Sequence, residues 1–204
     1  KSIAFSTGGT KMFMIGNNDS VYQYTLSTAF NMSTASYDSV SFSVGSQDAS
    51  ATGVTFDTTG TKMFILGNIN NAIFQYTLST AFDVSTASYD SVSFSVASQD
   101  ASPQEVVFNA DGTKMFMLGS ASNSVYQYTL STAFVMSTAS YDSVSFSVAS
   151  QDANSFGLAF NTTGTKMFIL GNINDSVFQY TLSTGFNVST ASYDSVSFSV
   201  ASQD

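Results

Sequence analysis

One segment, Gly-Thr-Lys-Met-Phe, occurs four times in this chain of 204 residues. Its threonine stands at Thr10, Thr61, Thr113 and Thr165, so successive copies are 51, 52 and 52 residues apart. A period of this length is typical of folds in which one supersecondary unit is repeated and packs on its neighbours. The sequence therefore predicts a single repeat domain over 1–204. Its four units have approximate bounds 1–48, 49–100, 101–152 and 153–204.

Each copy contains four segments with strand character, most complete in the fourth copy. The strands predicted there are 157–160, 166–170, 177–182 and 195–200. Gly164 suits a hairpin turn between the first two, because glycine accepts a positive φ. The later two alternate apolar and polar side chains, as a half-buried strand does. Helix signals are absent throughout, so each copy predicts one blade of a β-propeller.

The predicted fold class is all-β, a β-propeller of four-stranded antiparallel blades with four blades in this chain. Two alternatives stay open, because four blades are few for this class of fold. The chain could form half of an eight-bladed ring, or it could be a slice of a longer blade array.

The recurring aromatic residues and methionines are expected to pack rather than to bind ligands. Phe186 and Tyr193, with their counterparts in the other copies, should pin the long connection 183–194. Tyr180, Phe168 and Met167 lie inside predicted strands, where core packing is the usual role of such side chains. Stacking of sugars on these rings is the alternative.

A resemblance follows from the run at 157–168, Gly-Leu-Ala-Phe-Asn-Thr-Thr-Gly-Thr-Lys-Met-Phe. It resembles the inner hairpin of bacterial lactonase-like and YVTN-type propeller repeats, and 53–64 and 105–116 keep the pattern, with Glu105 in place of the first glycine. The second half of each copy is more similar to tandem repeats of bacterial or phage surface proteins. The first resemblance would imply a hydrolase with a metal ion or histidine at the channel mouth, where this chain offers Glu105 and scattered aspartates.

Charge and composition argue against several classes of function. The formal net charge is −9, from 14 acidic residues against 5 lysines, and histidine and cysteine are absent. Nucleic acid is not an expected partner because phosphate binding needs clustered cations. Insertion into a membrane is not expected, since the apolar runs are too short. Without histidine, arginine or cysteine, we predict that the chain is not an enzyme and has no catalytic or metal-binding residue.

Most acidic residues recur at equivalent positions in the copies. These are Asp38, Asp90, Asp142 and Asp194, then Asp48, Asp100, Asp152 and Asp204. We expect each to cap a turn by accepting backbone N–H groups. The alternative is a ring of carboxylates that binds Ca²⁺, so no cofactor is expected unless it is calcium. The recurring lysines, such as Lys166, are expected to be solvated or paired with aspartate.

The copies differ most at the start of the first strand, which in propellers lies at the mouth of the central channel. We predict a ligand-binding site at this mouth. Its residues would be Ser2, Thr52, Gln104, Glu105 and Phe156. Drift at a tolerant position is the alternative.

The leading functional hypothesis is a non-catalytic protein of the extracellular space or cell surface. It would serve in adhesion, receptor binding or structural self-assembly into a fibre or surface array, because nearly identical copies provide multivalent or stacking surfaces. The expected partners are further copies of the chain, as a homo-oligomer or longer array, or a cell-surface or glycan ligand. The alternatives are a lactonase-like propeller hydrolase and a Ca²⁺-stabilised scaffold.

Overall fold

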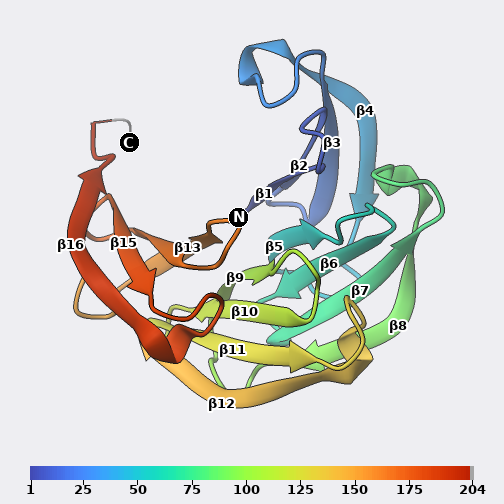
Figure 1. Cartoon of the computed structure of the whole chain (residues 1–204). Coiled ribbons are helices and arrows are strands. Elements are labelled where there is room, and N and C mark those ends of the chain that lie inside the picture. The colour runs from blue at the N-terminus through green and yellow to red at the C-terminus, as the bar shows by residue number, and fades with distance from the viewer. Residues whose placement is uncertain (203–204) are drawn as a thin grey trace. The chain divides into compact units, whose positions relative to one another are not determined.

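The computed structural model describes residues 1–202 and consists of four antiparallel four-stranded sheets (Figure 1). The first blade contains β1 (Ile3–Phe5), β2 (Lys11–Ile15), β3 (Ser20–Leu26) and β4 (Ala35–Ser43). The second contains β5 (Ala51–Phe56), β6 (Lys62–Gly67), β7 (Ala72–Leu78) and β8 (Ala87–Ser95). The third contains β9 (Pro103–Phe108), β10 (Lys114–Gly119), β11 (Ser124–Leu130) and β12 (Ala139–Ser147). The fourth contains β13 (Ser155–Phe160), β14 (Lys166–Gly171), β15 (Ser176–Leu182) and β16 (Ala191–Ser199).

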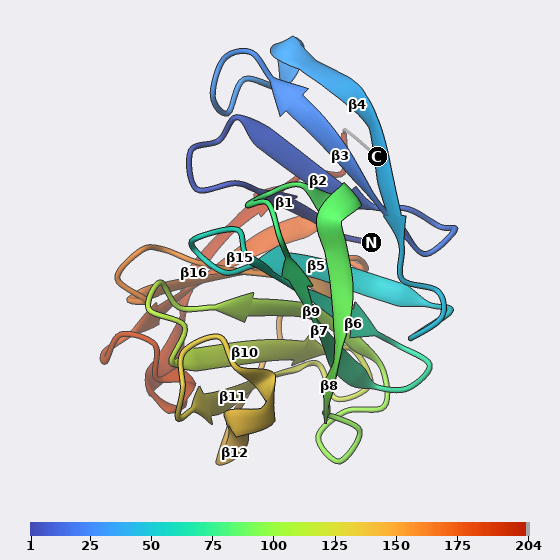
Figure 2. The same ribbon diagram turned by 90° about the vertical axis from the view of Figure 1, so that its right-hand side faces the viewer.

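Within each blade, the strands lie across the sheet in chain order. Figure 2 shows this for the first blade, where β1 to β4 form one twisted sheet. The order arises because each strand is joined to the next by a turn or short connection, which makes antiparallel neighbours. The predicted fold class is confirmed: the chain is all-β and provides four four-stranded antiparallel β-propeller blades. No helix of the described part is long and apolar enough to cross a membrane.

The predicted strands are found in every blade, but the fourth strand is longer than expected. In the last blade it begins at Ala191 rather than at Ser195. The register shifts between Gln179 and Tyr180 of the neighbouring strand, so Tyr193 pairs with Tyr180 on one side of a β-bulge. Ser195 lies at this bulge with a φ of 58°. The strand was predicted to begin only at Ser195 because the bulge interrupts the alternation of apolar and polar side chains at that residue.

Helical structure is also present, contrary to the expectation that it is absent. The connection before each fourth strand contains a single 3₁₀ turn. These are η1 (Met32–Thr34), η2 (Val84–Thr86), η3 (Met136–Thr138) and η4 (Val188–Thr190). At η4, the side chain of Asn187 accepts a hydrogen bond from the backbone of Ser189 at 3.1 Å. A turn of three residues carries no apolar periodicity, so the sequence pattern could not reveal it.

The aromatic residue of this connection does hold it in place, as predicted. Phe186 donates its backbone N–H to the carbonyl of Gly164 at 3.0 Å, and its ring lies against that glycine. A Cβ at position 164 would collide with the ring, and Gly164 has a φ of +68°. This position therefore requires glycine for two reasons, the close approach and the left-handed backbone.

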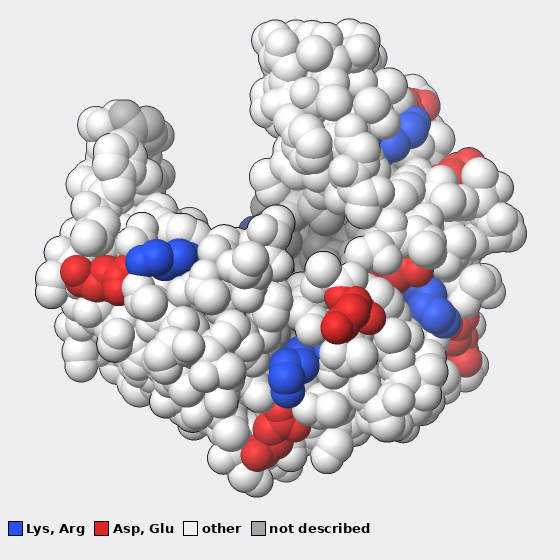
Figure 3. All heavy atoms as spheres, in the orientation of Figure 1, with Lys and Arg blue, Asp and Glu red and all other residues white. Residues whose placement is uncertain are grey.

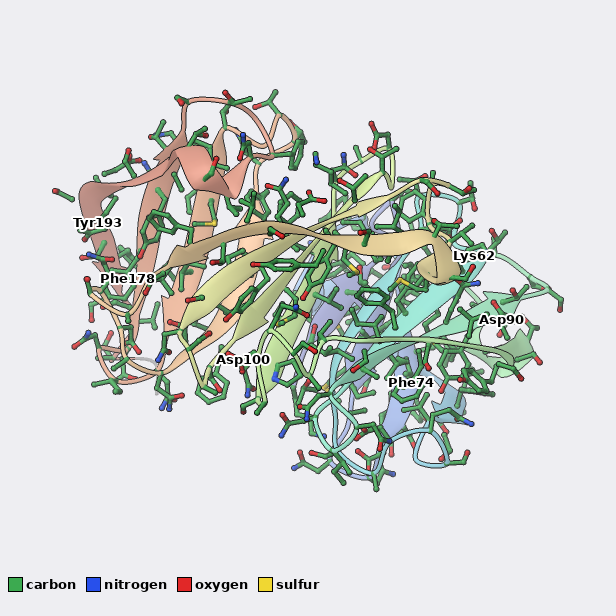
Figure 4. All side chains as sticks on the ribbon, turned by 90° about the horizontal axis from the view of Figure 1, so that it is seen from below. Lys62, Phe74, Asp90, Asp100, Phe178 and Tyr193 are labelled. Carbon is green, nitrogen blue, oxygen red and sulfur yellow. The ribbon has the colours of Figure 1, made fainter. Side chains whose placement is uncertain are left out.

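The chain divides into two compact units, residues 1–95 and 96–204, and each contains two blades. In each unit, the two blades pack their sheets face to face over an apolar core. Phe13 and Met63 are fully buried in the first unit, and Phe116 and Met167 in the second. The predicted core role of the strand aromatics and methionines is confirmed there. Figure 4 shows Phe178 and Tyr193, whose ring centroids lie 6.2 Å apart on neighbouring strands of the last blade.

Candidate functional site

A pocket of about 270 Å³ lies in the second unit. It is lined by Glu105, Gly157, Leu158, Ala159, Phe168, Leu170 and Val177. Glu105 is the one ionisable member of this lining, and every other member is apolar or glycine. An apolar cavity with a single polar group is the usual composition of a small-molecule site.

Two strand pairings place the walls of this pocket. Glu105 stands on β9 opposite Leu118 of β10, and Gly157 stands on β13 opposite Leu170 of β14. A Cβ added at Gly157 would lie 3.1 Å from the Cβ of Leu170, so a larger residue would crowd this wall. Because Gly157 has no side chain, the pocket beside Glu105 stays open.

Apolar side chains that line the pocket are more exposed than their counterparts in the neighbouring blade. Leu170 is 40% exposed, whereas Leu118, the equivalent residue one repeat earlier, is fully buried. Phe168 is half-buried, whereas its counterpart Phe116 is fully buried. The pocket therefore lies on the face of the fourth blade that corresponds to a packed face in the third.

The sequence-predicted residues of this unit have different surroundings. Glu105 lines the pocket, and its carboxylate accepts a hydrogen bond from the backbone of Val106 at 3.2 Å. Phe156 precedes the pocket residue Gly157 and is 38% exposed. The amide of Gln104 instead donates to the hydroxyl oxygens of Ser102 and Ser120, both at 3.0 Å. The side chain of Gln104 therefore ties two loops together.

The sequence-predicted residues of the first unit belong to the ends of its sheets. Ser2 is buried, and its carbonyl accepts a hydrogen bond from the backbone of Ile15 at 3.2 Å. The hydroxyl of Thr52 donates to the carbonyl of Leu66 at 3.4 Å. Both residues therefore extend the pairing of a first strand with its neighbour. Ligand binding by the five predicted residues stays a prediction.

Pocket residues other than Glu105 were not predicted as site residues from the sequence. Leu158, Phe168, Leu170 and Val177 occupy the same repeat positions as core residues. Of these four, only Phe168 was expected from the sequence to pack in the core. The same kind of apolar residue stands at each of these repeat positions whether or not a neighbouring blade of the unit covers it. The sequence of one copy therefore cannot show which of these positions is exposed.

Aspartates at the two sets of repeat positions have different roles. Asp100 accepts backbone N–H groups of Ser102 at 2.8 Å and Ser122 at 2.9 Å, so the predicted capping role is confirmed at this position. Asp48 and Asp152 make equivalent bonds. Asp204 lies outside the described residues. These caps hold the loops after β6, β10 and β14.

The capping prediction is wrong for the other set. Asp194 accepts hydrogen bonds from the side chains of Lys166 at 2.8 Å and Gln179 at 2.7 Å. Asp38 is bonded in the same way by Lys11 and Gln23. The β-bulge turns these carboxylates across the sheet toward the preceding strands, which removes them from backbone turns.

These side-chain bonds change the acidity of Asp194. The Lys166 ammonium, followed by the Thr181 hydroxyl and the Gln179 amide, lowers the pKa of Asp194 to about 2. The expected pairing of lysine with aspartate is confirmed for Lys11, Lys114 and Lys166. Figure 3 shows lysines beside acidic side chains on a face that is otherwise mostly uncharged.

Within residues 1–202, no three acidic side chains lie close enough together to hold a metal ion. The recurring carboxylates are instead bonded to backbone N–H groups or to lysine, glutamine and threonine side chains.

The fold is that of a β-propeller, and Glu105 adjoins an apolar pocket in its second unit. Searches found no protein-family model that matches the chain and no curated protein that matches it. Solved structures do match it.

A functionally unknown protein from Desulfotomaculum acetoxidans DSM 771 is 18% identical, with a TM-score of 0.61 over 95% of this chain and 56% of that one. A putative 6-phosphogluconolactonase from Bacteroides fragilis is 8% identical, with a TM-score of 0.62, and the match covers 98% of this chain and 54% of that one. The periplasmic gluconolactonase of Pseudomonas aeruginosa is 14% identical, with a TM-score of 0.58, and the match covers 98% of this chain and 53% of that one. The chain spans just over half the length of these proteins. The resemblance to lactonase-like propellers is thereby confirmed at the level of the fold.

These neighbours correct the prediction that the chain is not an enzyme. That prediction was drawn from missing residue types, whereas two structures with a similar fold are named as a putative 6-phosphogluconolactonase and a gluconolactonase. Its physical weakness is that a carboxylate can act as a general base without histidine, arginine or cysteine. The structure places one such carboxylate, that of Glu105, at an apolar pocket.

Proposed function

We propose that this protein acts in adhesion outside the cell, and that its four blades bind a neutral carbohydrate surface together. The observation that carries this proposal is the identity of the four outermost strands. Each of β4, β8, β12 and β16 has the sequence Ala-Ser-Tyr-Asp-Ser-Val-Ser-Phe-Ser. Four equal surfaces would raise the avidity for a repetitive ligand, because binding of one blade raises the effective ligand concentration at the next.

The chemistry of this surface favours carbohydrate. In every outermost strand, the serines at the second, fifth, seventh and ninth positions are exposed. A serine hydroxyl can both donate and accept a hydrogen bond, as sugar hydroxyls do. The net charge of −9 opposes acidic glycans, which makes neutral glycans the expected partners.

The backbone of these outermost strands is shaped so that they do not pair with the sheet of another protein. The bulge at Ser39 and its equivalents, each with a positive φ, bends the edge of the sheet. Bulges of this kind protect an edge strand from pairing with the edge of another protein. The side chains of the outermost strand therefore remain available to a ligand.

An array of immobilised neutral glycans tests the proposal. The fourfold variant Ser41→Ala, Ser93→Ala, Ser145→Ala and Ser197→Ala should lose on the order of 10²-fold in apparent affinity, and Ser41→Ala alone far less, because avidity multiplies small contributions. The matched control replaces the exposed loop residues Ser27, Ser79, Ser131 and Ser183 with alanine and should bind as the unmodified chain does. Absence of binding to every neutral glycan, or an equal loss in the control, would contradict the proposal.

A second candidate function, lactone hydrolysis, is favoured by Glu105 at the pocket. In this reaction, the Glu105 carboxylate would take a proton from water as the water oxygen attacks the lactone carbonyl carbon. The ring C–O bond would then break, and the protonated Glu105 would give that proton to the leaving ring oxygen, which yields the hydroxy acid and restores the carboxylate. Hydrolysis of glucono-δ-lactone, followed by proton release, measures it. Glu105→Gln should lower the rate by about 10²-fold or more, because general-base catalysis contributes on that order. A rate no higher than that of buffer, or one unchanged by the substitution, would exclude this role.

A further inference from the structure

Contacts between the third and fourth blades define how one repeat docks on the next. The side-chain oxygen of Gln127 accepts a hydrogen bond from the backbone of Val188 at 3.0 Å, in a buried position. The ring of Phe146 meets the ring of Tyr180 edge to face, with centroids 5.6 Å apart. The third blade thus provides a glutamine and a phenylalanine, and the fourth provides a 3₁₀ turn and a tyrosine.

The first unit contains the same arrangement. Gln23 accepts a hydrogen bond from the backbone of Val84 at 3.0 Å, and the rings of Phe42 and Tyr76 lie 5.7 Å apart. The arrangement recurs because the residues that make it recur with the repeat. Any blade that presents the glutamine and phenylalanine can therefore dock on any blade that presents the turn and tyrosine.

The fourth blade presents the first half of this interface, and no other blade of the described part of its own unit, residues 96–202, packs on it. Phe198, the equivalent of Phe146, is 71% exposed, and Val196 is 49% exposed. Gln179 bonds to Asp194 through its amide nitrogen, as Gln127 does to Asp142. Its side-chain oxygen accepts no hydrogen bond from any residue of 1–202.

The first blade presents the second half. Met32, the equivalent of Val188, is 53% exposed, whereas Val188 is fully buried. Ile3 is 59% exposed, whereas its counterpart Leu158 is 6% exposed. Phe30 is 62% exposed, and the centroid of its ring lies 5.7 Å from that of Phe5. This aromatic pair is therefore formed before any partner binds.

We infer that two copies of this chain dock end to end, with the fourth blade of one copy against the first blade of the other. The side-chain oxygen of Gln179 would accept the backbone N–H of the second copy's Met32. The ring of Phe198 would meet that copy's Tyr24 edge to face. The second copy's Ile3 would pack toward the exposed side chain of Leu170. The first two contacts repeat those that the chain makes between its own third and fourth blades, where Leu118 and Leu158, the counterparts of Leu170 and Ile3, belong to one core.

A second copy fits these faces because every copy carries both of them. The matched propeller structures are nearly twice as long as this chain, so a second copy would also provide a comparable number of residues. An interface between two different faces closes into a ring when its rotation permits and otherwise extends into a filament. This inference does not depend on the proposed adhesion, since it concerns other surfaces of the blades.

Two complementary variants test the docking, with mass measured by light scattering during size-exclusion chromatography. Phe198→Lys blocks the face of the fourth blade, and Met32→Lys blocks the face of the first. The unmodified chain should form a dimer or a larger species, and each variant alone should be monomeric. An equimolar mixture of the two should form a dimer, because one intact interface remains between them.

The control is Ile173→Lys. Ile173 is 59% exposed, and its counterpart Ile69 is 61% exposed, so this position does not belong to an interface between blades. The control should associate as the unmodified chain does, and circular dichroism should show all three variants folded. A chain that is monomeric at every concentration would overturn the inference, as would self-association of Met32→Lys alone, which would show a face that pairs with itself. Because no glycan is present, this result is separate from the outcome of the glycan array.

Discussion

The side-chain oxygen of Gln127 accepts the backbone N–H of Val188 at 3.0 Å, and this bond joins two blades. The same side chain donates to Asp142 within its own blade at 2.8 Å. One residue therefore connects the bulged outer strand of a blade to the 3₁₀ turn of the next. Gln179 keeps only the second of these two bonds within residues 1–202, to Asp194 at 2.7 Å.

This difference predicts unequal effects of the same substitution. Gln127→Leu and Gln179→Leu both remove the bond to aspartate, but only Gln127→Leu leaves a buried backbone N–H without an acceptor. Gln127→Leu should therefore lower the free energy of unfolding by about 1–3 kcal/mol more than Gln179→Leu. Urea unfolding at a low protein concentration, where the chain is monomeric, measures the difference. Equal losses would show that the bond between the blades contributes nothing.

A glycine beside a capping aspartate should not tolerate a methyl group. A Cβ at Gly119 would collide with the carboxylate of Asp100, which holds the loop through backbone bonds to Ser102 and Ser122. Gly119→Ala should destabilise the chain by about 1–3 kcal/mol, as overpacking usually does. Gly8→Ala is the control, because no heavy atom beyond its two chain neighbours lies within 4 Å of the position that its Cβ would take. Thermal unfolding of the two variants should differ accordingly, and equal melting temperatures would refute the prediction.

Asp194 should make the fold sensitive to acid. Its pKa is lowered to about 2 in the folded chain, against 3.8 in the absence of its partners, so the folded state binds fewer protons in this range. The stabilisation is complete above pH 4 and is lost as the pH falls toward 2. In Asp194→Asn, the urea midpoint should change less between pH 5 and 2. Asp83→Asn is a suitable control because Asn31 and Asn187 occupy the same position in other copies; a parallel pH dependence for both variants would contradict this role.

Buried tyrosines should make the fold sensitive to alkali. Burial raises the pKa of Tyr76, Tyr128 and Tyr180 well above the ordinary value of 10.0. The unfolded chain would ionise these phenols near pH 10 while the folded chain keeps them neutral. Stability is therefore unaffected below pH 10 and falls as the pH rises further.

Absorbance titration near 295 nm should show these tyrosines ionising only when the chain unfolds. Tyr180 donates its hydroxyl to the side chain of Gln151 at 3.1 Å, so Tyr180→Phe should cost about 1 kcal/mol at neutral pH and reduce the loss of stability above pH 10. Tyr37→Phe is the control, since Tyr37 is 45% exposed. The prediction fails if all tyrosines ionise before the circular dichroism changes.

Much of the fold could be predicted because the repeat supplies four versions of one pattern. The strand around Val177 alternates side chains, and Gly164 marks the turn before its neighbour, which are local properties of the chain. The bulge at Ser195 and the 3₁₀ turn at Val188 were not predicted. The bulge depends on pairing with residues of the neighbouring strand, such as Tyr180, and the 3₁₀ turn is too short to carry an apolar period.

The candidate site shows the same division. Variation between copies singled out Glu105, which lines the pocket, but it also singled out Gln104 and Ser2, whose bonds serve loops and strand pairing. The sequence by itself determined the repeat, the all-β class and the blade, because the side-chain period and turn residues are local. Only the tertiary structure decided that Leu118 is buried and Leu170 exposed, because burial depends on which blade packs against each face, whereas the two positions carry the same residue.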